Sequence, residues 1–446
     1  MPGDFASAVV QEAERCAATV ELPDEDATDI PFVTVDPAGS RDLDQAVHLA
    51  RDGDGYVVHY AIADVASFIA PGGAVDAEAR VRGETLYFPD VRVPLHPAVL
   101  SEGAASLLPG QVRPAVLWRI SLAADGAVTD VGVRRARVRS TAQLDYRGVQ
   151  RDVDAGRAPD ALSVLREVGE ARLAQARARH AVNLDLPEQE VSRADDGSWT
   201  LALRTDRPVE RYNAEISLLT GMCAASIMLD GGVGLLRTVP PPDRGAVRSL
   251  RGAAQALGIA WPDGMAPGDV LASLDRADPK HVAFLEHAGA LLRGSGYTPF
   301  DGAPPQQTLH SGIGAPYAHV TAPLRRLADR FGSEVCLALH AGQPVPDWVR
   351  QALPDLPATM ERTDRLGHQV DRAVVDATEA WLLRDRVGET FAAVVIDADT
   401  HAGTVVLDHP AVRARCHGDA LPVGERITVR LDTADVDKRQ VAFSRA

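Results

Sequence analysis

Three aspartates near the start of the chain have the residue type and the spacing for metal chemistry. Asp36, Asp42 and Asp44 lie within nine residues of one another, in the stretch FVTVDPAGSRDLDQAVHL. The residues before Asp36 favour a β-strand, and a turn rich in Pro, Gly and Ser follows it. Asp42 and Asp44 are two residues apart, so on an extended segment their side chains point to the same side.

Such a cluster of carboxylates favours a bound cation. Like charges a few ångströms apart raise each other's pKa, and a divalent cation removes that penalty. Carboxylate oxygens suit Mg²⁺ or Mn²⁺ rather than zinc, and these ions commonly serve phosphoryl chemistry. The alternative is a solvated, Asp-rich turn, and this segment alone leaves both interpretations open.

The segment resembles the catalytic motif of the ribonuclease II/ribonuclease R family, the RNB domain, usually D-x-x-x-x-x-D-x-D-D. Asp36, Asp42 and Asp44 match its first three acidic positions, and Gln45 stands at the fourth. Further blocks resemble the family in the family's order: AIADVASFI, LYFPDVRVPLHPAVLSEGAASLLPGQVRPAVLWRISL, YNAEISLLTGMCAASIM and YAHVTAPLRRLADR. Together these blocks cover residues 30–340, so the resemblance extends well beyond one short motif.

The resemblance implies an α+β fold with two main domains. An RNB catalytic domain of mixed and antiparallel sheets with surrounding helices is expected over 30–342, followed by a Pro-rich linker and a long helix over 343–385. The β-rich segment 386–446 resembles the OB-fold RNA-binding domain of ribosomal-protein type. The segment 1–29 is too short for the cold-shock domains that precede the catalytic domain in many relatives, so we expect a member without them.

Hydrophobic periodicity and turn residues give the expected elements. Pro323 is expected in the first turn of a helix, where its missing N–H is harmless. In the last sixty residues we expect four strands, with Phe391 and Phe443 in the barrel core. The strands expected before that are 45–50, 56–63, 116–122 and 129–139, with a hairpin turn at 52–55, and the helices are 6–19, 158–182, 210–229, 244–257, 267–275, 280–292, 324–340 and 359–384.

The resemblance also implies an activity. It implies a 3′→5′ exoribonuclease that acts on single-stranded RNA and processively releases nucleoside 5′-monophosphates. Asp36, Asp42 and Asp44 would hold one or two Mg²⁺ ions, with Mn²⁺ as the alternative, and Asp44 is the carboxylate most directly tied to the chemistry. The residues alone indicate only metal-assisted phosphodiester hydrolysis.

Arg325 matches the family's catalytic arginine, and a guanidinium suits the charge that develops on phosphoryl oxygens. The alternative is an ion pair between Arg325 and Asp329, one helical turn later. Arg326 is expected to assist in binding RNA.

Three further positions match residues that hold the RNA, and a fourth departs from the family. Tyr87 matches an aromatic that stacks on the terminal bases, although it could also be a core residue with a satisfied hydroxyl. Tyr146 and Glu215 match residues that hold the 3′ end; Glu215 could accept hydrogen bonds from ribose hydroxyls or lie on an exposed helix face. Leu184 falls near the second wall of the family's aromatic clamp, and leucine stacks poorly.

Gln45 leaves two interpretations open, because an amide lacks the charge of the fourth acid. In the first, the enzyme is active, and water, Gln45 itself or the scissile phosphate supplies the missing ligand. In the second, the domain is a catalytically weakened RNA-binding or regulatory protein. The presence of the other three aspartates and Arg325 favours the first.

The composition is compatible with this function but does not by itself indicate it. A net charge of −16 is unusual for an RNA-binding protein, so a local basic surface is needed. Arg134, Arg135, Arg137 and Arg139 could line a basic channel or be the solvated face of an edge strand.

The remaining features indicate a cytoplasmic protein, which we expect to be a monomer. The chain has no run of about twenty apolar residues and no basic start followed by an apolar run, so neither a membrane span nor a secretory signal is expected. The four cysteines form no CxxC pair, which indicates reduced, structural thiols.

Overall fold

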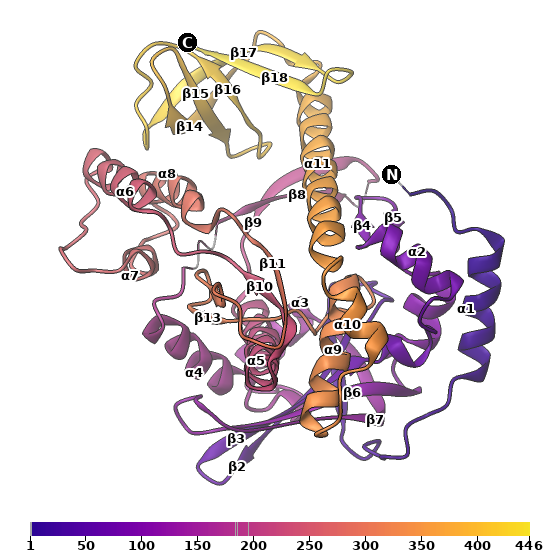
Figure 1. The fold of residues 1–446 in the computed structure, drawn as a ribbon. Helices are drawn as coiled ribbons and strands as arrows, with labels where there is room; N and C mark the ends of the chain where they lie inside the picture. The colour runs from indigo at the N-terminus through magenta and orange to yellow at the C-terminus, as the bar shows by residue number, and fades with distance from the viewer. Residues whose placement is uncertain (1, 183, 185, 195) are drawn as a thin grey trace.

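The chain folds into two closed β-barrels that are surrounded and connected by helices (Figure 1). The computed structural model describes residues 2–182, 184, 186–194 and 196–446. The first barrel lies at the bottom of Figure 1, and the second, in yellow, lies at the top. The 28-residue helix α11, Leu356–Leu383, rises from the first domain to the second. The expected α+β class, with a C-terminal barrel, is confirmed.

The first barrel carries the acidic loop between its first two strands. Its strand order is β1-β2-β3-β6-β7, and β7 pairs in parallel with β1 to close it. The expected strands are all present. β7 continues to Asp145 instead of ending at 139, because its last residues pair with β1 from Phe32 to Asp36. The bounds are β1 Phe32–Asp36, β2 Gln45–Asp52, β3 Gly55–Ala63, β6 Val112–Leu122 and β7 Val128–Asp145.

The predicted hairpin turn between β2 and β3 is confirmed. Gly53 has a φ of +59°, a conformation that glycine adopts readily. At Gly55 a Cβ atom would lie 2.0 Å from the carbonyl oxygen of Leu122, so no side chain fits there.

Apolar side chains on both faces of this barrel pack against helices. Trp118 and Val58 belong to the core that includes α5 and α9, whereas Ala61 and Leu117 belong to the core shared with α1 and α2. The helices of this domain are α1 Ser7–Thr19, α2 Ala74–Arg82, α3 Tyr146–Asp154, α4 Leu165–Ala178, α5 Pro208–Gly231, α6 Arg244–Leu257, α7 Pro267–Ala272, α8 Pro279–Ala288, α9 Leu327–His340 and α10 Asp347–Ala352.

Short two-stranded sheets link these helices. Their strands are β4 Leu86–Tyr87 with β5 Arg92–Val93, β8 Glu188–Arg193 with β9 Trp199–Arg204, β10 Val233–Thr238 with β11 Gly296–Asp301, and β12 Leu309–His310 with β13 Ala315–Pro316.

The prediction that α9 begins at residue 324 was wrong. Residues 323–325 form a turn, and the helix begins at Leu327. Arg326 has extended backbone angles (φ −134°, ψ 126°) and forms a β-bridge with Glu84. The N–H of Thr85 donates to the Arg325 carbonyl oxygen at 3.0 Å, so pairing with this neighbouring segment holds residues 325 and 326 out of the helix.

The predicted helix 158–182 is also shorter than expected. Pro159 precedes a short 3₁₀ turn, Asp160–Leu162, and only Leu165–Ala178 forms α4.

Helix α5 has the length and apolar composition of a membrane-spanning helix, although the sequence predicted none. Half of its most apolar window is buried. Ile216, Leu219 and Met228 are completely buried in the core of the first domain, so core packing accounts for the apolar character of α5.

The C-terminal barrel has five strands, one more than predicted. The missed strand, β16, is short and alternates arginines with small buried residues, which gives a weak sequence signal. Phe391 and Phe443 pack edge to face in the core with ring centroids 6.0 Å apart, as predicted. The strands are β14 Thr390–Ala398, β15 Ala402–Leu407, β16 Arg413–His417, β17 Arg426–Asp435 and β18 Gln440–Arg445.

Polar contacts fix this barrel to the rest of the chain. Glu379 of α11 is buried and accepts hydrogen bonds from the Arg413 backbone N–H and the Gln189 side chain, both at 2.7 Å. The Arg413 guanidinium also forms two 3.0 Å hydrogen bonds with Glu286 of α8. These contacts hold the barrel over the first domain.

Neither interpretation of the arginines on β7 describes what they do. β7 is not an edge strand, because it pairs with both β6 and β1. Arg135 pairs with Asp64 and Glu334, Arg137 with Asp26, and Arg134 with Glu25. These three arginines therefore join the N-terminal segment and α9 to the barrel.

The buried Arg330–Asp76 ion pair generates a stability prediction. Both side chains are at most 2% exposed, and their atoms approach to 2.6 Å. Asp76→Ala leaves the guanidinium buried without its counter-charge, so we expect the free energy of unfolding of the first domain to fall by about 3–5 kcal/mol. Denaturant titration measures the change. Glu361→Ala, in the exposed Glu361–Arg365 pair, is the control and should have little effect.

Candidate active site

The loop between β1 and β2 holds the three aspartates in fixed positions. Asp36 is the last residue of β1, and Asp44 immediately precedes β2. Ser106 fixes the loop between them, because its hydroxyl donates to the Arg41 carbonyl at 2.6 Å and accepts from the Leu43 N–H at 3.0 Å. The completely buried side chain of Leu43 anchors the same segment in the core.

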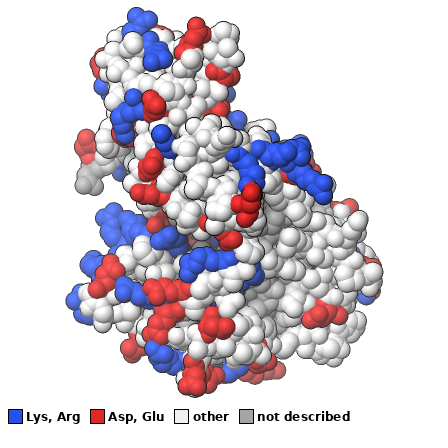
Figure 2. Space-filling model, turned by 90° about the vertical axis from the view of Figure 1, so that its left-hand side faces the viewer, with Lys and Arg blue, Asp and Glu red and all other residues white. Residues whose placement is uncertain are grey.

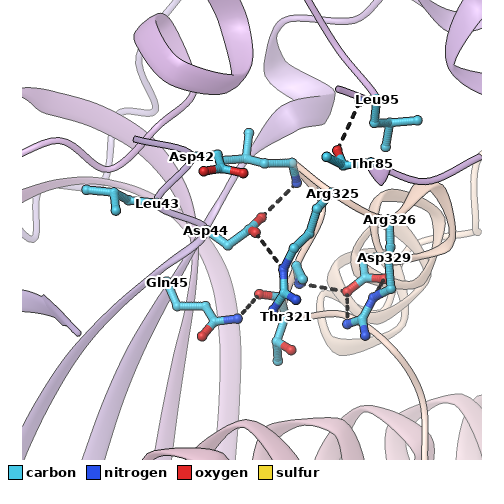
Figure 3. Close-up of polar contacts among 12 residues, drawn as sticks. Asp42, Leu43, Asp44, Gln45, Thr85, Leu95, Thr321, Arg325, Arg326 and Asp329 are labelled. Atoms are coloured by element: carbon cyan, nitrogen blue, oxygen red, sulfur yellow. Dashed lines mark hydrogen bonds and ion pairs between the residues drawn. The ribbon is translucent and has the colours of Figure 1, made fainter. Parts of the chain in front are cut away.

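Asp44 joins the two ends of the site (Figure 3). Its carboxylate is 4% exposed. One oxygen accepts from the Leu324 backbone N–H at 2.7 Å, and the other accepts from Nε of Arg325 at 3.2 Å. The acidic loop and the arginine predicted from the sequence therefore meet, although 281 positions separate Asp44 from Arg325 in the chain.

The alternative pairing of Arg325 with Asp329 is wrong. Asp329 is completely buried and binds Arg326 instead, with contacts of 2.9 Å to Nε and 2.8 Å to Nη2. Asp329 also accepts from the Ala322 N–H at 2.7 Å. Arg326 thus supports the loop that carries Arg325, and its expected contact with RNA stays a prediction.

Asp42 lies between two side chains from the β4–β5 segment. Its carboxylate accepts from the Tyr87 hydroxyl at 3.0 Å and from Arg92 at 2.8 Å. Tyr87 is 47% exposed, so it is not the core residue of the alternative interpretation. Sequence reasoning missed Arg92, whose only signal was its place within the matched LYFPDVRVP block.

Burial perturbs two of the three carboxylates. Desolvation raises the pKa of Asp44 to about 7, although Arg325 and the Leu324 N–H oppose the rise and Asp42 adds to it. Desolvation likewise raises the pKa of Asp36 to about 6, again opposed by Arg325 and increased by Asp42. The Asp42 carboxylate therefore acts on both Asp36 and Asp44, and Arg325 opposes the rise in both pKa values.

The donor set fits a hard divalent cation by its chemistry. Carboxylate oxygens are the ligands that Mg²⁺ prefers, and a cation would lower the raised pKa values of Asp36 and Asp44. One oxygen of Asp36 is buried without a hydrogen-bond partner. In the described part of the chain, however, no three His, Cys, Asp or Glu side chains converge closely enough to hold a metal ion as they stand. Arg325 and Arg92 now supply the positive charge.

Two further predicted residues lie on helices α3 and α5. Tyr146 begins α3 directly after β7, and its hydroxyl accepts from Asn213 of α5 at 3.2 Å. Glu215, also on α5, is 6% exposed, so the alternative of an exposed helix face is wrong. One of its carboxylate oxygens is buried without a hydrogen-bond partner, and desolvation raises its pKa despite Arg172 and Arg179.

A cleft of about 2100 Å³ adjoins the site at Tyr87, whose hydroxyl binds Asp42, whereas the three aspartates and Arg325 are not part of its lining. Tyr87, Glu215 and Leu184 all line it, and its far wall is formed by the C-terminal barrel, including Arg415 and Arg426. As many acidic as basic side chains line this cleft. Figure 2 shows the two charges interleaved on one face of the molecule. The structure therefore has room for an extended chain between its two domains, although the cleft has no excess of basic side chains.

Comparison with known proteins identifies the family. The model of the RNB domain matches residues 24–332, and that of the RNase II-type exonuclease C-terminal S1 domain matches residues 389–446. The chain belongs to the RNB family. It is 29% identical to exoribonuclease 2 of Serratia proteamaculans (strain 568), over 88% of this chain and 62% of that protein. It is 26% identical to ribonuclease R of Escherichia coli (strain K12), over 95% of this chain and 58% of that protein. The chain spans about three fifths of the length of these relatives.

Solved RNB structures share its fold. The apo form of Mycoplasma genitalium RNase R matches with a TM-score of 0.89 and 20% identity, over 100% of this chain and 76% of that chain. Yeast Ssd1, described as a pseudonuclease, matches with a TM-score of 0.74 and 19% identity. The match covers 93% of this chain and 53% of that chain. The RNB fold is thus found in an inactive protein too, so activity has to be argued from the site.

The raised pKa values generate a prediction about stability in the absence of metal. An unfolded Asp ionises near pH 4, whereas folded Asp36 and Asp44 ionise near about 6 and 7. Between the pKa of the unfolded Asp and those of folded Asp36 and Asp44, the folded state binds more protons than the unfolded state. The free energy of unfolding in EDTA should therefore fall as the pH rises through this range. In Asp44→Asn the fall should be shallower, as measured by thermal unfolding across this pH range. The matched change at fully exposed Asp263, Asp263→Asn, should leave the slope unchanged.

Proposed function

We propose that this protein is a 3′→5′ exoribonuclease that hydrolyses single-stranded RNA to nucleoside 5′-monophosphates. The observation that carries the proposal is the contact of Arg325 with Asp44, because it joins a guanidinium to a cluster of three carboxylates. A phosphodiester needs both groups: oxygen ligands for a cation and a fixed positive charge for the phosphoryl oxygens.

The proposed reaction is the hydrolysis of the last phosphodiester bond at the 3′ end. A water oxygen bonds to the phosphorus of the last phosphodiester, and the bond from phosphorus to the preceding 3′ oxygen breaks. The leaving oxygen takes a proton and becomes the new 3′ hydroxyl, while the phosphate stays on the released 5′-monophosphate. Negative charge grows on the phosphoryl oxygens during this step, which is where a guanidinium is most effective.

Each residue of the centre then has a defined task. Asp36, Asp42 and Asp44 would hold Mg²⁺, or Mn²⁺ as the alternative. The metal, when bound, supplies Lewis acidity and a more acidic water. Nε of Arg325 binds Asp44, and its Nη groups make no hydrogen bond to the described residues, so they are available to a phosphate.

The cleft supports RNA as the substrate. Tyr87 presents a half-exposed ring beside Asp42, suited to stacking on a base. The unpartnered oxygen of Glu215 can accept a hydrogen bond from a ribose hydroxyl, the group that separates RNA from DNA. RNase R of Mycoplasma genitalium has been solved with ribose-methylated single-stranded RNA and with double-stranded RNA.

The first test is direct hydrolysis. A 5′-labelled oligoribonucleotide incubated with the protein and Mg²⁺ or Mn²⁺ should shorten stepwise, and EDTA should stop the reaction. Asp44→Asn should reduce hydrolysis to the EDTA level and leave RNA binding intact, because it removes one negative charge without changing the shape of the side chain. Filter binding of the same oligonucleotide measures the second property.

Two outcomes would contradict the proposal. Wild-type turnover by Asp44→Asn would remove Asp44 from the chemistry. A wild-type protein that retards the oligonucleotide but leaves it intact would instead support a catalytically weakened RNA-binding protein, the interpretation that Gln45 leaves open.

The second test removes the guanidinium. Arg325→Ala should lower kcat by about 10²–10³-fold, the effect of deleting one preorganised donor to a developing anion. KM should change much less, because the contact strengthens in the transition state. Arg365→Ala, which removes an exposed arginine on α11, is the control and should keep wild-type kinetics. An increase in KM with an unchanged kcat would show that Arg325 only binds RNA.

A further inference from the structure

Both ends of the Gln45 carboxamide are engaged by the protein. Its Nε2 donates to the Thr321 carbonyl oxygen at 2.6 Å, and its Oε1 accepts from the Tyr60 hydroxyl at 2.7 Å. Tyr60 is 1% exposed, so this chain of hydrogen bonds begins in the barrel core. Figure 3 shows the Gln45 side chain turned toward Thr321, while Asp44 beside it reaches Arg325.

Thr321 lies four residues before Arg325, in the loop 317–326 that connects β13 to α9. The Thr321 hydroxyl lies 2.8 Å from that of Ser217 on α5, so the residue is held from two sides. Farther along, the Ala322 N–H donates to Asp329 and the Leu324 N–H to Asp44, both at 2.7 Å. Each contact fixes one point of the loop, and Gln45 holds the point just before the turn that presents Arg325.

We propose that Gln45 is a positioning residue for Arg325, and that this role requires a neutral amide. The inference rests on the proposed function of Arg325. A carbonyl oxygen such as that of Thr321 needs a donor, and an ionised carboxylate has none to offer, whereas an amide donates at every pH. Glutamate at position 45 would place an acceptor oxygen where Nε2 now lies, 2.6 Å from another acceptor. Aspartate, the residue usual at this motif position, is shorter and equally unable to donate.

This role differs from that of a substitute metal ligand, and the two make opposite predictions. If Gln45 were a ligand, Gln45→Glu would add charge and lower the Mg²⁺ concentration needed for activity. If Gln45 holds the loop, Gln45→Glu lowers kcat, because a guanidinium displaced by as little as about 1 Å loses much of its effect on the transition state. The Mg²⁺ requirement and KM then stay close to wild type.

The test is a double-mutant cycle on the intact chain. Single-turnover hydrolysis of a 5′-labelled oligoribonucleotide is measured for Gln45→Glu and Gln45→Leu, each in the wild-type and Arg325→Ala backgrounds. Gln45→Glu should lower the rate about 10–100-fold in the first background and less than about 3-fold in the second, since residues that act through one group are not additive. Gln45→Leu should show the same pattern at matched folding, judged by thermal unfolding.

Gln307→Glu is the matched control. Gln307 also donates from Nε2 to a backbone carbonyl, that of Leu309 at 2.8 Å, but it lies outside the site. This variant should keep the wild-type rate. Additive losses in the cycle, or a lower Mg²⁺ requirement in Gln45→Glu, would overturn the inference and leave the proposed function standing. A wild-type protein without hydrolysis would overturn both.

Discussion

The burial of Asp44 is the constraint on which the site depends. A carboxylate at 4% exposure is unstable as an anion unless donors surround it, and this one obtains them from Leu324 and Arg325. To reach it, residues 323–325 leave the helical path that the sequence favours and form a turn. Pairing of this turn with Glu84 and Thr85 then brings Tyr87 toward Asp42, so a single buried charge organises three distant segments.

The distribution of arginine explains how a chain with a net charge of −16 could handle RNA. Several arginines that line the cleft have acidic partners, as Arg413 has Glu286 and Arg426 has Asp408. Such pairs add little net field. We therefore expect phosphate recognition to depend on donors that have no acidic partner and on the Nη groups of Arg325. The apolar and aromatic side chains of the cleft would bind RNA through van der Waals and stacking contacts instead of through charge.

Local patterns in the sequence predicted much of this structure, and long-range pairing explains the rest. The strands of the first barrel, helix α6 and four of the C-terminal strands follow from periodicity and turn residues, whereas the closure of those strands into a barrel was implied by the family resemblance. The meeting of Asp44 with Arg325 came from matched motifs, since nothing local links residues 281 apart. The start of α9 at Leu327 and the partner of Asp329 were missed, because they depend on which of two adjacent arginines faces the buried acid. Sequence spacing alone does not distinguish Arg325 from Arg326 as the partner of Asp329.

The same reasoning bears on the amide at position 45. The pKa of Asp44 is already raised to about 7 and that of Asp36 to about 6, with Asp42 contributing to both. A fourth carboxylate beside them would raise these values further, because like charges in a poorly solvated site disfavour ionisation. A neutral amide adds no such repulsion and supplies the donor that the Thr321 carbonyl needs. In this chain, therefore, we expect activity to depend less on the number of acids in the motif than on the position of the arginine that faces them.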